Sequence, residues 1–160
     1  MNSFNLKSYM TAIVDNHLST LPHFDFSLTE VSGLGGLEGI LSGQVHQNNF
    51  IATDSTGDGY ISQHSNGGYF LRRVATIFIV RKYQYGNMAD MLVNVEICRA
   101  IFKRILRQMI ADKDKLANNL VYINTERIAF REFEPETSAH FTGLYFMLEY
   151  EQPYNILSDE

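Results

Sequence analysis

The stretch YFLRRVATIFIVRKYQYGNMADMLVNVEICRAIFKRILRQMIA, residues 69–111, decides the fold. Its first part is rich in β-branched and aromatic residues, which predicts a long strand over residues 69–83. The centre of this run, residues 74–80, is almost continuously apolar, as is typical of a strand that is buried on both faces. A turn at residues 85–87 follows, and Asn87 is a suitable N-cap for the helix predicted over residues 88–111.

The predicted helix has one apolar stripe, which indicates that a single face packs against the rest of the protein. The residues of the stripe are Met88, Met91, Leu92, Val95, Cys98, Ile101, Phe102, Ile105, Leu106 and Met109. The charged run at residues 112–115, together with Asn118 and Asn119, is expected to end the helix. Arg99, Lys103, Arg104 and Arg107 lie toward its C-terminal half, where the helix dipole favours cations.

The flanking segments complete the prediction. An amphipathic helix is expected over residues 4–21 with Ser3 as its N-cap, and residues 23–47 are expected to form a docked loop. Strands are predicted over residues 50–53, 120–133 and 140–150. The last one alternates, with Thr142, Leu144, Phe146, Leu148 and Tyr150 on one face. Together these elements predict an α+β fold, with a mainly antiparallel sheet packed against the long helix and the N-terminal helix.

Length and composition favour one domain over residues 1–160, with residues 54–68 as a flexible loop or arm and residues 153–160 as a frayed tail. The chain has 45% hydrophobic and only 19% charged residues, with 11 Phe and 9 Tyr. Few charges and many aromatic side chains favour contact with another subunit. The net charge of −5 disfavours sequence-specific nucleic-acid binding. The single cysteine, the lack of a signal-like N-terminus and the lack of a long apolar run favour the cytoplasm over a membrane or secreted location.

The sharpest local motif lies in the predicted arm. In residues 54–65, Asp54, Thr56, Asp58 and Ser62 stand where an EF-hand loop places oxygen ligands for calcium. Ser65 stands where that loop needs a bidentate glutamate, and no helix is predicted on either side. Because Asp and Gly are also common in hairpin loops, we expect no metal here, with calcium binding as the less favoured alternative.

No other motif predicts a catalytic residue, a cofactor or a metal. The glycine-rich residues 33–39 lack the spacing of a nucleotide-binding loop, and the histidines lack metal-ligand spacing. Cys98 is expected to be a small core residue. The basic face of the long helix is interpreted as a solvated or subunit-facing surface. A small enzyme that uses His140 or His46 with nearby carboxylates stays open as a further alternative.

In the order of its elements the chain resembles the tail-terminator and tail-completion subunits of bacteriophages and contractile tail-like particles. The resemblance is carried by the strand 69–83, the Asn87-capped helix, and the closing strands 120–133 and 142–150. It implies a non-enzymatic assembly protein that forms a ring of six copies, caps the tail tube and docks the next component. It also implies assembly in the host cytoplasm, followed by residence in the virion or particle.

For such a ring the partners would be further copies of the chain and the tube or neck proteins. The contacts are expected from the arm, the basic helix face and the outward face of the last strand. The residues expected at this subunit interface are Tyr60, Ile61, Arg99, Arg104, Arg107, Tyr145 and Met147.

Overall fold

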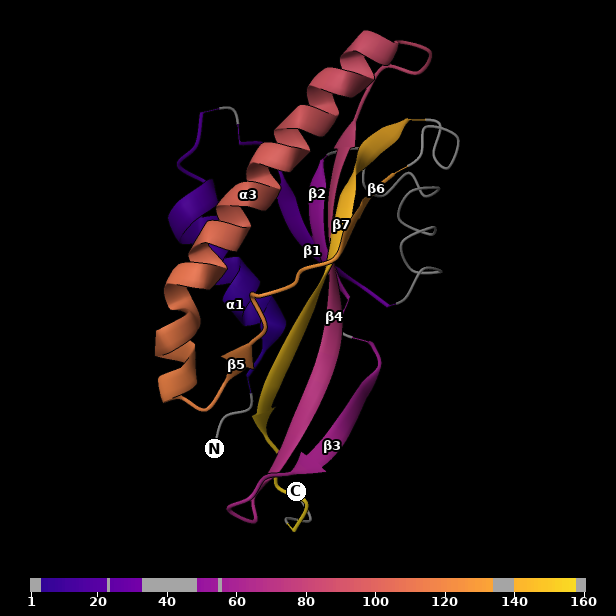
Figure 1. The fold of residues 1–160 in the computed structure, drawn as a ribbon. Coiled ribbons are helices and arrows are strands. Elements are labelled where there is room, and N and C mark those ends of the chain that lie inside the picture. The colour runs from indigo at the N-terminus through magenta and orange to yellow at the C-terminus, as the bar shows by residue number, and fades with distance from the viewer. Residues whose placement is uncertain (1–3, 23, 33–48, 55, 134–139, 158–160) are drawn as a thin grey trace.

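Figure 1 shows the computed structural model of the chain, which describes residues 4–22, 24–32, 49–54, 56–133 and 140–157. Ser3, His23, His46, most of the glycine-rich segment and the end of the tail lie outside the described residues. The fold is α+β, as predicted from the sequence: a mostly antiparallel sheet packs against one long helix and a short N-terminal helix.

The sheet has seven strands, with the order β1-β2-β4-β7-β5, while β3 pairs with β4 and β6 pairs with β7. The strands are β1 (Ser27–Val31), β2 (Phe50–Asp54), β3 (Gly59–Gln63), β4 (Tyr69–Lys82), β5 (Tyr122–Ile123), β6 (Phe130–Glu132) and β7 (Phe141–Pro153). β1 and β2 are parallel, and the other pairs are antiparallel. The long pair β4–β7 is the centre of the sheet, and its register runs from Phe70↔Pro153 to Lys82↔Phe141.

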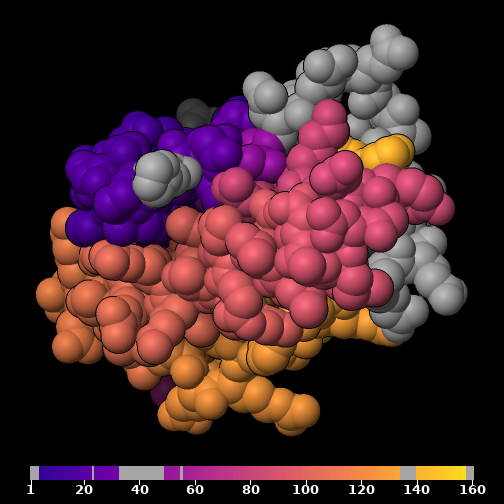
Figure 2. Space-filling model, turned by 90° about the horizontal axis from the view of Figure 1, so that it is seen from above, coloured from indigo at the N-terminus to yellow at the C-terminus, as the bar shows by residue number. Residues whose placement is uncertain are grey.

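The helices cover one face of this sheet. α1 (Leu6–Ile13) continues into a π-helical turn, η1 (Val14–Leu18), and α3 (Met88–Asn118) follows β4 and runs back along it. Figure 2 shows α3 crossing the molecule with the N-terminal segment along one side and the segment that follows the helix along the other. A helix of 31 residues is about 46 Å long, which matches the length of the 14-residue strand β4.

The main core lies between the helices and the sheet. On β7 the predicted alternation is confirmed, because Leu144, Phe146, Leu148 and Tyr150 are buried in this core. β4 contributes Ala75, Ile77 and Ile79, and α3 contributes Cys98, Ile101, Ile105 and Met109. A smaller cluster occupies the other face and contains Val31, Phe50, Ala52, Phe78, Val80 and Phe141. The apolar centre of β4 is therefore buried on both faces, as its sequence predicted.

The ends of the helices differ from the prediction. Asn5 caps α1, because its side chain accepts a hydrogen bond from the backbone N–H of Ser8 at 3.0 Å. Asn87 caps α3 as predicted, but the helix continues to Asn118. Asn118 and Asn119 stand at the end of the helix as predicted, whereas residues 112–115 remain helical, and Asp112 accepts hydrogen bonds from Tyr9 on α1 and from Gln108 one turn earlier.

Three strand predictions also needed correction. β1 lies in the segment predicted as a docked loop, where it gains a parallel partner in β2. The run predicted as one strand over residues 120–133 forms two short strands, β5 and β6, on the same edge of β7. The segment predicted as a flexible loop or arm, residues 54–68, contains β3, which forms a hairpin with β4 that extends past the main body of the sheet.

Candidate functional site

The candidate calcium loop is a short connection between β2 and β3, two strands that pair with the same side of β4. β2 pairs with residues 76–80 of β4, and β3 pairs with residues 69–73 of the same strand, so both lie along one edge of β4. Between them, a Cβ atom on Gly57 would stand 2.3 Å from the carbonyl oxygen of Val74. The glycines of this motif are therefore explained by close approach to β4.

The proposed calcium ligands do not converge. The Asp54 carboxylate accepts hydrogen bonds from the backbone N–H and the hydroxyl of Thr56, at 2.9 and 2.7 Å. Ser62, however, lies opposite Phe70, whereas Asp54 lies opposite Thr76. Six positions along a strand correspond to about 20 Å, which is far beyond the reach of one ion. Among the described residues, no group of three His, Cys, Asp or Glu side chains is arranged to hold a metal.

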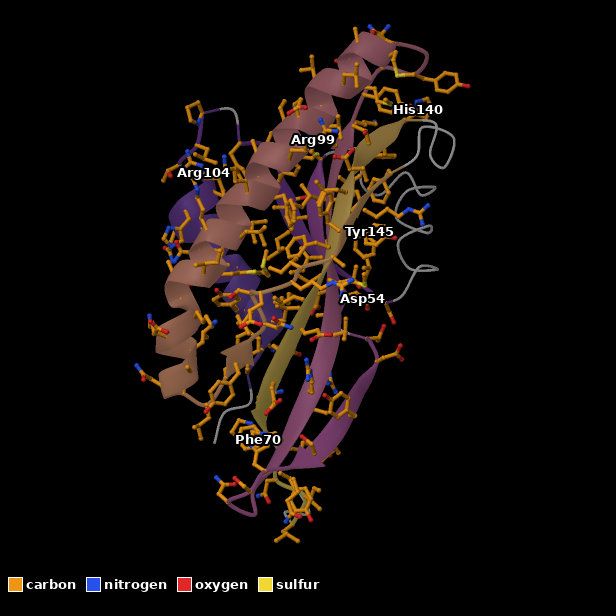
Figure 3. All side chains as sticks on the ribbon, viewed as in Figure 1. Asp54, Phe70, Arg99, Arg104, His140 and Tyr145 are labelled. Atoms are coloured by element: carbon orange, nitrogen blue, oxygen red, sulfur yellow. The ribbon has the colours of Figure 1, made fainter. Side chains whose placement is uncertain are left out.

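The arginines of α3 divide into two groups. Arg99 is engaged within the chain: it donates to both carboxylate oxygens of Glu132 on β6, at 2.5 and 2.8 Å, and pairs with Glu96. These bonds hold the pKa of Glu132 below its usual value. Arg104 projects from the other side of the helix (Figure 3), and in the described part of the chain neither it nor Arg107 has an ion-pair partner. Arg104 and Arg107 are therefore available to another molecule, and Arg99 is occupied.

Tyr145 and Met147 are on the sheet face that the helices leave uncovered. The ring of Tyr145 is half-buried, 5.6 Å from the ring of Phe78 and 6.2 Å from that of Phe133. Met147 lies two residues further along β7 on the same face and is exposed. Of these two predicted interface residues, Met147 has the more accessible side chain.

The hairpin formed by β3 and β4 is fixed by a polar network on this uncovered face. Arg72 donates to the hydroxyl of Tyr60 at 2.7 Å and to the carboxylate of Glu149 at 2.6 Å, while Asn124 donates to the same carboxylate at 3.2 Å. The bond from Arg72, and then that from Asn124, lower the pKa of Glu149. The network holds the hairpin against β7.

A second contact fixes the tip of the hairpin. The Nε2 atom of His64 lies 2.6 Å from the carboxylate of Glu151 on β7, and the His64 ring stacks on Phe70 with centroids 3.9 Å apart. Sequence reasoning did not identify this pair, because its members are 87 positions apart and only the β4–β7 register brings them together. The hairpin is thus a folded extension with a defined shape.

Ten of the fifteen exposed large apolar side chains of the described residues lie toward the two ends of the molecule. At the hairpin end, defined by β3, the β3–β4 turn and residues 154–157, they are Tyr60, Ile61, Tyr69, Tyr154, Ile156 and Leu157. At the helix-start end, defined by residues 83–93, they are Tyr85, Met88, Leu92 and Val93. In Figure 3, Phe70 marks the first end and His140 marks the other. Clusters of exposed apolar residues are typical of interaction surfaces.

The helix-start end contradicts part of the predicted stripe. Met88 and Leu92 were expected to pack as core residues, but they are 58% and 53% exposed. The sheet ends at the pair Lys82↔Phe141, and the first buried residue of α3 is Asn94. The beginning of the helix therefore lies past the end of the sheet. There, Tyr83, Tyr85, Gly86, Asn87, Met88 and Met91 line a hollow of about 210 Å³.

The residues considered for catalysis are not arranged as a reactive centre. Cys98 is fully buried in the main core, and burial raises the pKa of its thiol to about 12. Its side chain therefore stays protonated at neutral pH, and a protonated thiol is a poor nucleophile. The His140 ring lies 5.5 Å from the ring of Tyr85 at the helix-start end. His46, the other histidine of the enzyme hypothesis, lies outside the described residues.

Comparison with protein-family models and with curated proteins gives no match for this chain. Within the described residues, no helix has the length and apolar character needed to cross a membrane. The function is therefore argued from the two exposed ends and the hairpin.

Proposed function

We propose that this chain is a structural subunit that assembles head to tail into a closed ring and, as such a ring, terminates the tail tube of a phage or phage-like particle. The observation that carries the proposal is the pair of apolar ends on one elongated body. A contact between two different surfaces of identical subunits is heterologous, and it forms a ring when the rotation between subunits closes.

The hairpin supports the same proposal. β3 carries no charged residue and no proline within Gly59–Gln63, and it lies on an edge of the sheet. Edge strands that do not pair with another chain are usually protected by charges, prolines or bulges. Tyr60 and Ile61 are 55% and 46% exposed on this strand, so the hairpin has the properties of a surface that contacts another subunit.

The charge of the chain suits a ring around DNA. Its net charge of −5 repels phosphate, so the lining of a channel built from such subunits lets DNA pass with little binding. Arg104 and Arg107 are among the accessible cations of α3, and we assign them to contacts with an acidic surface of a neighbouring subunit or of the tube. The ring would act in the host cytoplasm and then remain in the particle.

Negative-stain imaging of the purified chain tests this proposal. The expected result is annular particles with a central channel, and the double variant Tyr60→Ser/Ile61→Ser is expected to give far fewer of them. Ile110→Ser is the matched control, because Ile110 is equally accessible on α3 but lies away from both ends. Small uniform particles of single-chain size at every concentration would contradict the proposal.

A further inference from the structure

We propose that residues 154–157 of one copy of this chain bind in the hollow at the helix-start end of the next copy. This inference rests on the proposed ring, since it names the contact that joins neighbouring subunits. It assigns a role to the segment after β7, which the sequence predicted only as a frayed tail.

The hollow has the chemistry of an apolar side-chain pocket. Its volume is about 210 Å³, and its walls include two tyrosine rings and the side chains of Met88 and Met91. Methionine is flexible and polarisable, so it adapts to the shape of an incoming side chain. The hollow is too small for a typical organic ligand, which needs about 300 Å³ or more, but it suits one or two apolar side chains.

The segment after β7 offers such side chains. Tyr154 and Ile156 are about half exposed, and Leu157 is 91% exposed, the highest value among the large apolar residues that the structure describes. The segment is anchored at its base, where the N–H of Tyr154 donates to the carbonyl of Tyr69 at 2.9 Å. Asn155 accepts a hydrogen bond from the N–H of Leu157 at 3.1 Å, which gives the segment a turn that presents Leu157 outward.

The two surfaces cannot meet within one chain. Tyr154 is bonded to Tyr69 at one end of β4, and the hollow begins at Tyr83, just past the other end. Fourteen positions along a strand span about 46 Å, far more than a four-residue segment can reach. Residues 154–157 therefore cannot reach the hollow of their own chain, and only another copy can place them there. A second copy supplies the segment in a head-to-tail arrangement, which is the arrangement that a ring requires.

Charge favours the same occupant. Asp159 and Glu160 follow Leu157 in the sequence, so the segment brings negative charge with it. The hollow lies at the N-terminus of the 31-residue helix α3, whose positive partial charge is offset in part by Asp90 in the first turn. Lys82, the last residue of β4, is exposed beside it. The sequence that follows Leu157 is therefore opposite in charge to Lys82 at this end of the molecule.

Disulfide trapping between two single-cysteine variants tests the contact. Leu157→Cys and Tyr85→Cys are purified separately, mixed and oxidised; Cys98 is fully buried and does not interfere. The expected result is a covalent dimer that contains one chain of each variant. The matched control mixes Leu157→Cys with Ile110→Cys, whose position is equally accessible on the same helix, and it is expected to give no dimer above the level of each variant alone.

The non-covalent self-association of a variant without an added cysteine provides the second measurement. Leu157→Gln is expected to weaken self-association at least about tenfold, because a buried apolar anchor is lost, while its thermal unfolding is unchanged. Equal trapping in the control mixture, or unchanged association of Leu157→Gln, would overturn the inference. If imaging shows rings but the Leu157–Tyr85 disulfide does not form, this contact is wrong and the proposed function stands. If the protein is monomeric and no disulfide forms, both fail.

Discussion

Gly57 shows how a single residue decides between two interpretations of the same sequence motif. A calcium loop requires glycine at its sixth position, which is Gly59 in this chain, and places no such requirement on Gly57. Here Gly57 lets the connection between β2 and β3 lie directly against β4, because an added Cβ would stand 2.3 Å from the carbonyl oxygen of Val74. The two interpretations make different predictions for a single substitution.

We expect Gly57→Ala to lower the free energy of unfolding by about 1–3 kcal/mol, since the backbone of β4 must move to admit the methyl group. Urea denaturation without calcium and with added calcium measures this. Gly68→Ala is the control, because the nearest atom to its added Cβ is a side-chain oxygen of Asn66 at 3.3 Å. A Gly57→Ala protein as stable as the control would contradict this explanation, and so would stabilisation of the natural chain by calcium.

Tyr9 connects α1 to α3 through a hydrogen bond to Asp112. Its hydroxyl lies 3.0 Å from the carboxylate of Asp112, near the end of α3. Replacing Tyr9 by Phe keeps the ring and removes this bond, so the free energy of unfolding is expected to fall by about 0.5–1.5 kcal/mol at pH 7. Asp112 also accepts a bond from Gln108 and therefore keeps one partner in the variant.

The same residue predicts a dependence on pH. Burial, and then the charge of Asp112, raise the pKa of the Tyr9 phenol. A raised pKa means that the folded protein holds the proton more tightly than the unfolded chain, whose tyrosine pKa is about 10. The advantage of the natural chain over Tyr9→Phe is therefore complete below about pH 10 and shrinks as the pH rises further. An advantage that grows above pH 10 would contradict this assignment.

At the scale of elements, the arginines of α3 have two different roles. Arg99 is bonded to Glu132, so Arg99→Ser is expected to lower stability through a looser contact between α3 and β6. The double variant Arg104→Ser/Arg107→Ser is expected to change stability by less than about 0.5 kcal/mol. It is expected to weaken assembly, since these side chains are accessible for another subunit.

Urea denaturation measures the stability of Arg99→Ser and of Arg104→Ser/Arg107→Ser, and sedimentation measures their assembly. Loss of stability in the double variant, or assembly that depends on Arg99 alone, would contradict the division. Raising the salt concentration is an independent check, because exposed charge contacts between subunits weaken as salt screens them.

The long elements could be predicted from the sequence, whereas the short ones could not. β4, β7 and the start of α3 carry strong local signals: an apolar run, an alternation and the Asn87 cap. β1 was missed because its partner in the parallel pair, β2, lies more than twenty residues away. The run over residues 120–133 was predicted as one strand because its residue types favour a strand. Residue types alone do not show that the chain leaves the edge of β7 between Ile123 and Phe130.

The candidate site was predicted only in part. The sequence pointed to the hairpin residues Tyr60 and Ile61, and both are exposed. The hollow at the helix-start end was not predicted, because periodicity assigns Met88 and Leu92 to the buried stripe without showing where the sheet ends. The apolar residues 154, 156 and 157, in a tail that is otherwise polar, were the one signal that could have indicated a contact there.

At the scale of the whole molecule, the account describes a long sheet-and-helix body with a different apolar surface at each end. One end carries the hairpin and the segment after β7, and the other carries the start of α3 (Figure 1). In the proposed ring, each copy would bury both surfaces against further copies. Closure into a ring leaves no end free, whereas an open chain of subunits would continue to grow.

The most direct test of the ring is the native mass of the purified chain, measured across a concentration series. The account predicts one closed species whose mass is a fixed multiple, expected to be six, of the 18.3 kDa chain, and whose size does not increase with concentration. A particle of 18.3 kDa at every concentration, or a mass that keeps rising without a limit, would contradict the central claim.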